Sequence, residues 1–149
     1  MKPDTPLISH LKRPLAFLLR LSLGGLFIYS GLSKIGQPYH FAAAIQAYQL
    51  LPEFFLGLTA AFIPWLETVG GLALVVGCKP RSALLLVMAL LATFIILIGL
   101  TMARGLDIDC GCGLLADRQV GWRVLAEDAI LLLMAAWLYA TLLPRSSVA

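Results

Sequence analysis

Four long apolar runs in the sequence restrict the possible fold more than any other feature. They cover about residues 14–35, 53–77, 82–102 and 122–143. A helix needs about 20 mostly apolar residues to cross a hydrocarbon core of about 30 Å, and each run is long enough. Hydrophobic residues make up 60% of the 149-residue chain and charged residues only 13%, far from the balance of a soluble domain. We therefore expect one all-α membrane domain, a bundle of four transmembrane helices.

Between the first two runs, residues 38–51 form a segment that is too polar and too short to cross a bilayer. Its apolar residues Phe41, Ile45 and Tyr48 recur at helical spacing, with polar residues on the other face. Amphipathic segments of this kind lie in the membrane interface. We therefore expect a short interfacial helix between the first and second spanning helices.

The distribution of charge indicates how the chain sits in the membrane. The net charge of +3 is small and forms no basic stripe, so the expected partner is the lipid bilayer and not nucleic acid. Of the Lys and Arg residues at or beyond the ends of the spans, six lie on the side of the two termini and four on the other side. Basic residues accumulate on the cytoplasmic side. We expect a bacterial inner-membrane protein with cytoplasmic termini and a periplasmic loop at residues 104–121.

This loop contains the tripeptide Cys110-Gly111-Cys112. Two cysteines one residue apart reach the usual Cα separation of a disulfide, about 4.4–6.8 Å, if the backbone bends. A bond across one residue restricts the unfolded chain little, whereas strained and exposed disulfides exchange readily. Disulfides also form and persist in the periplasm. The tripeptide therefore predicts a redox-active Cys110–Cys112 couple, and a purely structural disulfide is the weaker interpretation.

Charged residues inside the spans are further candidates. A charge at the centre of a span costs at least about 2.5–3.5 kcal/mol on insertion scales, so it needs a partner or a function. Arg20 and Glu67 lie about 9 and 16 Å from the cytoplasmic ends of their helices, and we expect them to pair. The pair has either a structural role or a role in binding a proton or a quinone. Asp128, near the start of the last span, is either a partner for the helix dipole or the nearest proton acceptor for a thiol.

Two more expectations concern the contact between the first and second spans. The pairs Gly24-Gly25 and Gly70-Gly71 would allow these helices to approach closely, because they carry no side chains. Lys34, at the end of the first span, is expected to reach lipid headgroups or Glu53.

The use of cysteine and histidine argues against a structural metal site. The chain has three cysteines and two histidines, without the four closely spaced ligands that zinc requires. We therefore expect no metal. Copper bound by Cys110, Cys112 and His40 is a weaker hypothesis, which rests on the preference of copper for thiolates.

Three motifs occur in order along the chain: the run at residues 20–34, the Pro-Trp-Leu-Glu run at 64–67 and the Asp-Cys-Gly-Cys run at 109–112. Together they resemble the DoxX-like membrane proteins, and most closely the branch of the methylamine-utilisation protein MauE. The resemblance covers nearly the whole chain from Pro14 onward. It implies a four-helix membrane bundle linked to thiol redox chemistry.

The resemblance also carries residues over to this sequence. The charged residues and the cysteines of the family correspond here to Arg20, Lys34, Glu67, Cys110 and Cys112. Two positions depart from the family pattern: Gly113 stands in place of a common Phe, and Glu127-Asp128 in place of Arg-Asp.

These observations lead to two functional hypotheses. In the first, the protein passes electrons between a periplasmic dithiol, or a thioredoxin-like partner, and a membrane acceptor such as a quinone. The resemblance implies that this supports the maturation of a periplasmic enzyme, and the protein would then be a thiol-disulfide oxidoreductase. In the second, the protein is a non-catalytic membrane anchor or assembly subunit, whose cysteines only shape a docking loop. The sequence leaves both hypotheses open.

Overall fold

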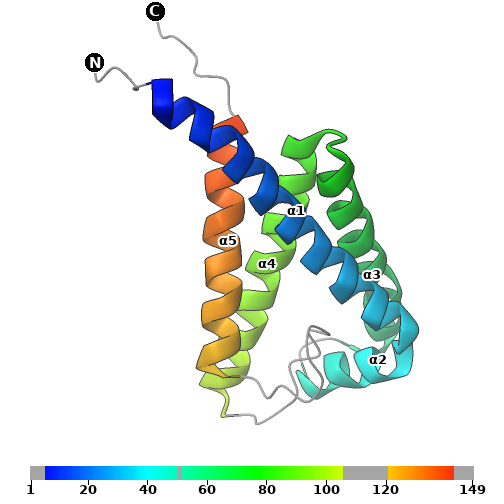
Figure 1. The fold of residues 1–149 in the computed structure, drawn as a ribbon. Helices are drawn as coiled ribbons and strands as arrows, with labels where there is room; N and C mark the ends of the chain where they lie inside the picture. Colours follow the sequence, from blue (N-terminus) through cyan, green and yellow to red (C-terminus); the bar gives the residue numbers. More distant parts are fainter. Residues whose placement is uncertain (1–5, 50–51, 106–120, 143–149) are drawn as a thin grey trace, which may run out of the picture.

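The computed structural model describes residues 6–49, 52–105 and 121–142. These ranges contain helices and no strands. In chain order the helices are α1 (Pro6–Gly36), α2 (Pro38–Ala47), α3 (Glu53–Val76), α4 (Pro80–Ala103) and α5 (Trp122–Leu142) (Figure 1). The helices α1, α3, α4 and α5 each contain a stretch long and apolar enough to cross a membrane. The expectation of an all-α, four-helix membrane bundle is confirmed.

The ends of the helices differ in places from the sequence expectation. α1 begins at Pro6 instead of about residue 14, and Pro14 lies inside the helix. Pro6 is compatible with the first helical position, because the N–H that proline lacks would have no partner there. α2 ends at Ala47, before the expected residue 51. α3 ends at Val76 and is capped by Gly77, which has a left-handed backbone (φ 81°) and donates its N–H to the Ala73 carbonyl. Such a residue is the common end of a helix.

The helices form two pairs that meet in one bundle. α1 runs obliquely along α3, and α4 lies beside α5 (Figure 1). One end of the bundle carries α2, the end of α4 and the start of α5, and we call it the α2 end. The turn between α3 and α4 and the start of α1 lie at the opposite end (Figure 1).

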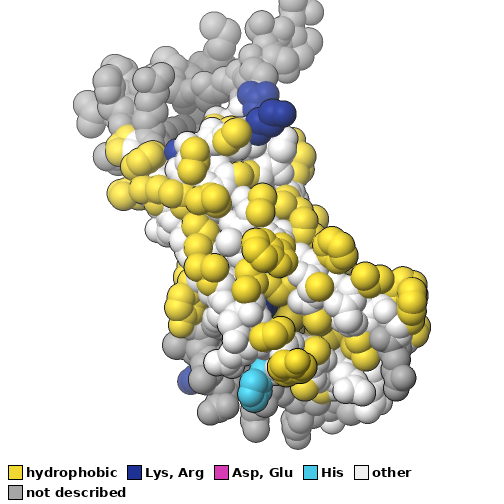
Figure 2. All heavy atoms as spheres, turned by 90° about the vertical axis from the view of Figure 1, so that its right-hand side faces the viewer, with side chains coloured by type: hydrophobic (Ala, Val, Ile, Leu, Met, Phe, Trp, Pro, Cys, Tyr) yellow, Lys and Arg dark blue, Asp and Glu magenta, His cyan; other side chains and the backbone are white. Residues whose placement is uncertain are grey.

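A stripe of buried apolar side chains joins the helix pairs. On α4 it contains Leu84, Val87 and Leu91, and on α5 Ala135 and Leu138. The spacing of three or four residues places each set on one helix face. Other large apolar side chains point outward, and Figure 2 shows hydrophobic side chains over the full height of one face. An apolar exterior suits a bundle surrounded by lipid.

Glycines allow α1 and α3 to pack with their backbones close together. A methyl group at Gly24 would lie 2.8 Å from the carbonyl oxygen of Gly71, and one at Gly31 would lie 2.6 Å from that of Pro64. Both distances are shorter than real contacts of a Cβ atom, so these positions require glycine. Gly25 faces open space, with no atom within 4 Å of such a methyl group. The close approach is therefore made by Gly24, Gly31 and Gly71.

Candidate functional site

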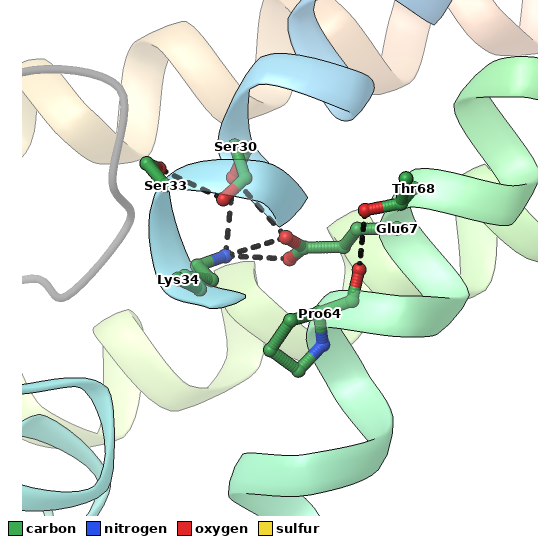
Figure 3. Close-up of polar contacts among 6 residues, drawn as sticks. All are labelled: Ser30, Ser33, Lys34, Pro64, Glu67 and Thr68. Carbon is green, nitrogen blue, oxygen red and sulfur yellow. Dashed lines mark hydrogen bonds and ion pairs between the residues drawn. The ribbon is translucent and has the colours of Figure 1, made fainter. Parts of the chain in front are cut away.

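A buried ion pair between Lys34 on α1 and Glu67 on α3 lies toward the α2 end (Figure 3). Lys34 Nζ donates to both carboxylate oxygens, at 2.6 Å from Oε1 and 2.8 Å from Oε2. Lys34 is 4% exposed and Glu67 is 1% exposed. Short bonds between ionised groups are among the strongest hydrogen bonds in proteins. Removing one partner would leave the other charge buried and unpaired, which is costly.

Ser30 and two aromatic rings complete the surroundings of the Lys34 ammonium. Lys34 Nζ also donates to Ser30 Oγ at 3.1 Å, and Ser30 Oγ donates to Glu67 Oε2 at 3.2 Å (Figure 3). The rings of Phe41 on α2 and Phe94 on α4 lie with their centroids 5.1 and 4.7 Å from Nζ. Ring faces attract cations at such distances. These contacts link the Lys34 ammonium on α1 to side chains on α2, α3 and α4.

Asp128 on α5 adds a second acid to this region. It is 8% exposed and lines the same pocket as Ser30, Lys34, Glu67 and Phe94. The cavity volume is about 30 Å³, enough for about two water molecules. All four spanning helices contribute to the pocket, and its other lining residues are apolar. Two acids and one basic residue thus share one small site, so their formal charges do not balance.

The polar residues reach the pocket because they occupy core positions of their helices. On α5, Asp128 follows the buried Val124 by four residues and precedes the buried Ala135 by seven. On α1, Lys34 continues the buried stripe of Leu23, Phe27 and Ser30. This heptad-like spacing is visible in the sequence and predicts that both charged residues face the core. The family resemblance included Lys34, but its position near the end of the span led us to expect its side chain at the headgroups or Glu53, although this spacing is visible in the sequence.

The expected pairing of Arg20 with Glu67 is wrong. Arg20 lies at the opposite end, where its guanidinium group lies beside Gly77 and over the ring of Phe17, 5.5 Å from the centroid. Its Nε atom is buried and has no hydrogen-bond partner among the described residues. The close helix contact sets the register of α1 on α3 and brings Lys34, not Arg20, to Glu67. The structure therefore does not bring the two predicted cofactor ligands together.

The expectation for Lys34 is also wrong, because its side chain is buried in the bundle and does not reach the headgroups. Cys110 and Cys112 lie outside the described residues, and so does their predicted disulfide. Cys78, the described cysteine, is a free and exposed thiol at the opposite end. Within the described ranges, no group of three His, Cys, Asp or Glu residues could hold a metal ion.

Tyr48, which directly follows α2, is close enough to Asp128 to interact with it electrostatically. It is 7% exposed, and burial raises the pKa of its phenol to about 12, with an added contribution from the nearby Asp128 carboxylate. Burial disfavours the charged form of any acid, and a neighbouring negative charge acts in the same direction. Tyr48 is therefore neutral at physiological pH and supplies no counter-charge to Asp128.

Comparisons with known proteins agree with the motif analysis. The family model described as "Methylamine utilisation protein MauE" matches residues 12–141. The curated protein "Methylamine utilization protein MauE" of Paracoccus denitrificans is 30% identical over 119 residues. That alignment covers 78% of this chain and 64% of the relative, so the chain matches a little less than two thirds of the relative's length. No solved structure matches the chain.

Proposed function

The chain belongs to the MauE family of membrane proteins, and from this premise we propose that it is a thiol-disulfide redox protein that works through Cys110 and Cys112. Its partner in this proposal is a periplasmic dithiol or thioredoxin-like protein, and its task is to support the maturation of a periplasmic enzyme. The names of the family and of the Paracoccus denitrificans relative refer to methylamine utilisation, so we extend the proposal to that process.

One observation carries this proposal. The chain enters residues 106–120 from the end of α4 and leaves them at the start of α5, and both helix ends belong to the α2 end of the bundle (Figure 1). The buried site of Lys34, Glu67 and Asp128 lies toward the same end. Asp128 follows Trp122, the first residue of α5, by about 9 Å of helix. The segment with the two thiols is therefore attached next to the one polar pocket described above, which supports a shared task.

The proposed reaction is an exchange of disulfides and balances without an added oxidant. A thiolate of the partner attacks the Cys110–Cys112 disulfide, and a mixed disulfide forms while one cysteine leaves as a thiolate. The second partner thiolate then attacks the mixed disulfide. The partner ends as a disulfide, and Cys110 and Cys112 end as thiolates that take up the two protons released when the partner's thiols became thiolates. Two electrons and two protons have then moved from the partner to this protein.

To work repeatedly, the couple must pass these electrons to a membrane acceptor, and a quinone is our proposal from the sequence. Between the described residues that line it, the pocket has room for about two water molecules and not for a quinone ring. Arg20 and Glu67 also lie at different sites. A quinone would therefore have to meet the dithiol outside this pocket.

The orientation is part of the proposal. The protein is a multi-pass membrane protein, which we assign to the bacterial inner membrane. The modest excess of Lys and Arg beside the termini supports cytoplasmic termini. The α2 end would then face the periplasm, where disulfides persist.

Equilibration of the purified protein with mixtures of a reduced and an oxidised small dithiol tests the proposal. Alkylation mass shifts report the state of each cysteine, and Cys78→Ser is the background, since it removes the described free thiol. We expect Cys110 and Cys112 to change state together at one redox poise. Cys112→Ser should hold a mixed disulfide on Cys110 when a monothiol and its disulfide replace the dithiol, because a monothiol has no second thiol to release itself. If the two thiols stay in one state over the whole range, the protein is an anchor or assembly subunit instead.

A further inference from the structure

The pocket at the α2 end contains an excess acid that the network of Lys34 and Glu67 does not use. Lys34 is fully engaged, because its ammonium group donates to both oxygens of Glu67 and to Ser30 Oγ. The pair is therefore neutral as a whole. Asp128 lines the same cavity as a second carboxyl group. If Asp128 is ionised, the site carries one unmatched negative charge, and if it binds a proton, the site is neutral.

Among the described residues, the groups that face Asp128 do not cancel this charge. On α1 and α3 the titratable lining residues are Lys34 and Glu67, which pair with each other. The α4 lining residues are apolar. Beyond α2, Tyr48 is neutral, and on α5 the neighbouring Glu127 is itself an acid. Within the described ranges, two of these surrounding groups are therefore negative, and the positive one, Lys34, is already bonded to Glu67.

Burial and space favour a proton at this place. Asp128 is 8% exposed and lies inside a membrane-spanning helix, where an unmatched charge is unfavourable. Two carboxyl groups that share one site also disfavour the ionisation of both. The cavity has room for about two water molecules, and water at this place could carry a proton to and from the carboxyl group. The site is too small for a larger ligand but large enough for a hydrated acid.

We propose that this pocket is a proton-exchanging site, in which Asp128 binds and releases one proton while the Lys34–Glu67 pair stays intact. The link to the cysteines rests on the function proposed above. There, the leaving cysteine thiolate needs a proton and a partner thiol must lose one. Asp128 gives its proton to the leaving cysteine thiolate and regains one from the partner thiol. The site therefore ends each exchange unchanged.

Infrared difference spectroscopy of the full-length protein in lipid nanodiscs tests the site itself. Spectra at two values of pH on either side of neutrality should contain one C=O band of a protonated carboxylic acid, which shifts in D₂O. We expect Asp128→Asn to remove this band and Asp128→Glu to restore one at a shifted position. Glu127→Gln is the matched control, because it changes the exposed neighbouring acid, and it should leave the band in place.

The same variants separate this inference from the proposed function. The inference is overturned if no such band exists, or if the band survives Asp128→Asn in a protein of normal thermal stability. The double variant Cys110→Ser/Cys112→Ser should keep the band, because the site does not need the thiols to bind a proton. In the exchange assay, Asp128→Asn should flatten the pH dependence of the rate and Glu127→Gln should not. An unchanged pH profile in Asp128→Asn would overturn the link to the cysteines alone.

Discussion

Lys34 and Arg20 are two basic residues on the same helix, α1, but their side chains have different surroundings. Lys34 is 4% exposed and bonds to Glu67 and Ser30 at the α2 end. Arg20 is less buried, lies beside Gly77 at the opposite end, and has a buried Nε without a hydrogen-bond partner among the described residues. A long side chain near the end of a span can extend its charge toward the interface, whereas a charge fixed in the core needs an opposite charge. The difference shows that the register of the helices, not the presence of a charge, decides which residue becomes part of a site.

The largest expected effect comes from removing Lys34. Lys34→Met leaves Glu67 buried without its partner, so the free energy of unfolding should fall by about 3–5 kcal/mol. The matched variant Arg20→Met breaks no ion pair in the part of the chain that the structure describes, and it loses a contact with Phe17 worth about 0.5–1 kcal/mol. Denaturant titration in detergent measures both. If both variants lost the same free energy of unfolding, the distinction between Lys34 at the α2 end and Arg20 at the opposite end would be wrong.

The double variant Lys34→Met/Glu67→Met sharpens this result. Replacing a whole buried ion pair with apolar residues is often neutral or stabilising, so most of the stability lost in Lys34→Met should return. A double variant as unstable as the single one would mean that Lys34 acts through packing and not through its charge.

The helix contact that sets the register gives the next largest effect. Gly31→Ala should cost about 1–3 kcal/mol, because the new methyl group overlaps the backbone of α3 near Pro64. Gly25→Ala is the control, since it meets open space on the same helix, and it should not destabilise the protein. Thermal unfolding measures the pair, and the account of the register fails if both variants behave alike.

The smallest effect is expected for Ser30. Ser30→Ala removes one hydroxyl from the network of Lys34 and Glu67, which should cost about 1 kcal/mol. The loss should be smaller in the Lys34→Met/Glu67→Met background, where Ser30 Oγ no longer contacts Lys34 and Glu67. An equal loss in both backgrounds would show that Ser30 acts elsewhere.

The four spans could be predicted from the sequence because hydropathy and length alone determine whether a helix can cross a membrane. The partner of Glu67 could not be found in the same way. The sequence indicates only the depth of each charged residue along its own helix. Which residue lies opposite Glu67 depends on the register of α1 on α3, and this register depends on where Gly24, Gly31 and Gly71 let the backbones meet. The buried position of Asp128 was within reach, since it lies on the stripe of Val124 and Ala135.

The thermodynamic contrast between the two ends matters for function only if the cysteines attached at the α2 end react. The redox state of Cys110 and Cys112 inside cells tests this most directly, by acid quenching, alkylation and mass shift in a Cys78→Ser background. The account predicts that reduced and oxidised forms are both present, and that the oxidised fraction falls when a membrane-permeable dithiol is added and recovers after it is removed. Cysteines that remain in a single state throughout would contradict it.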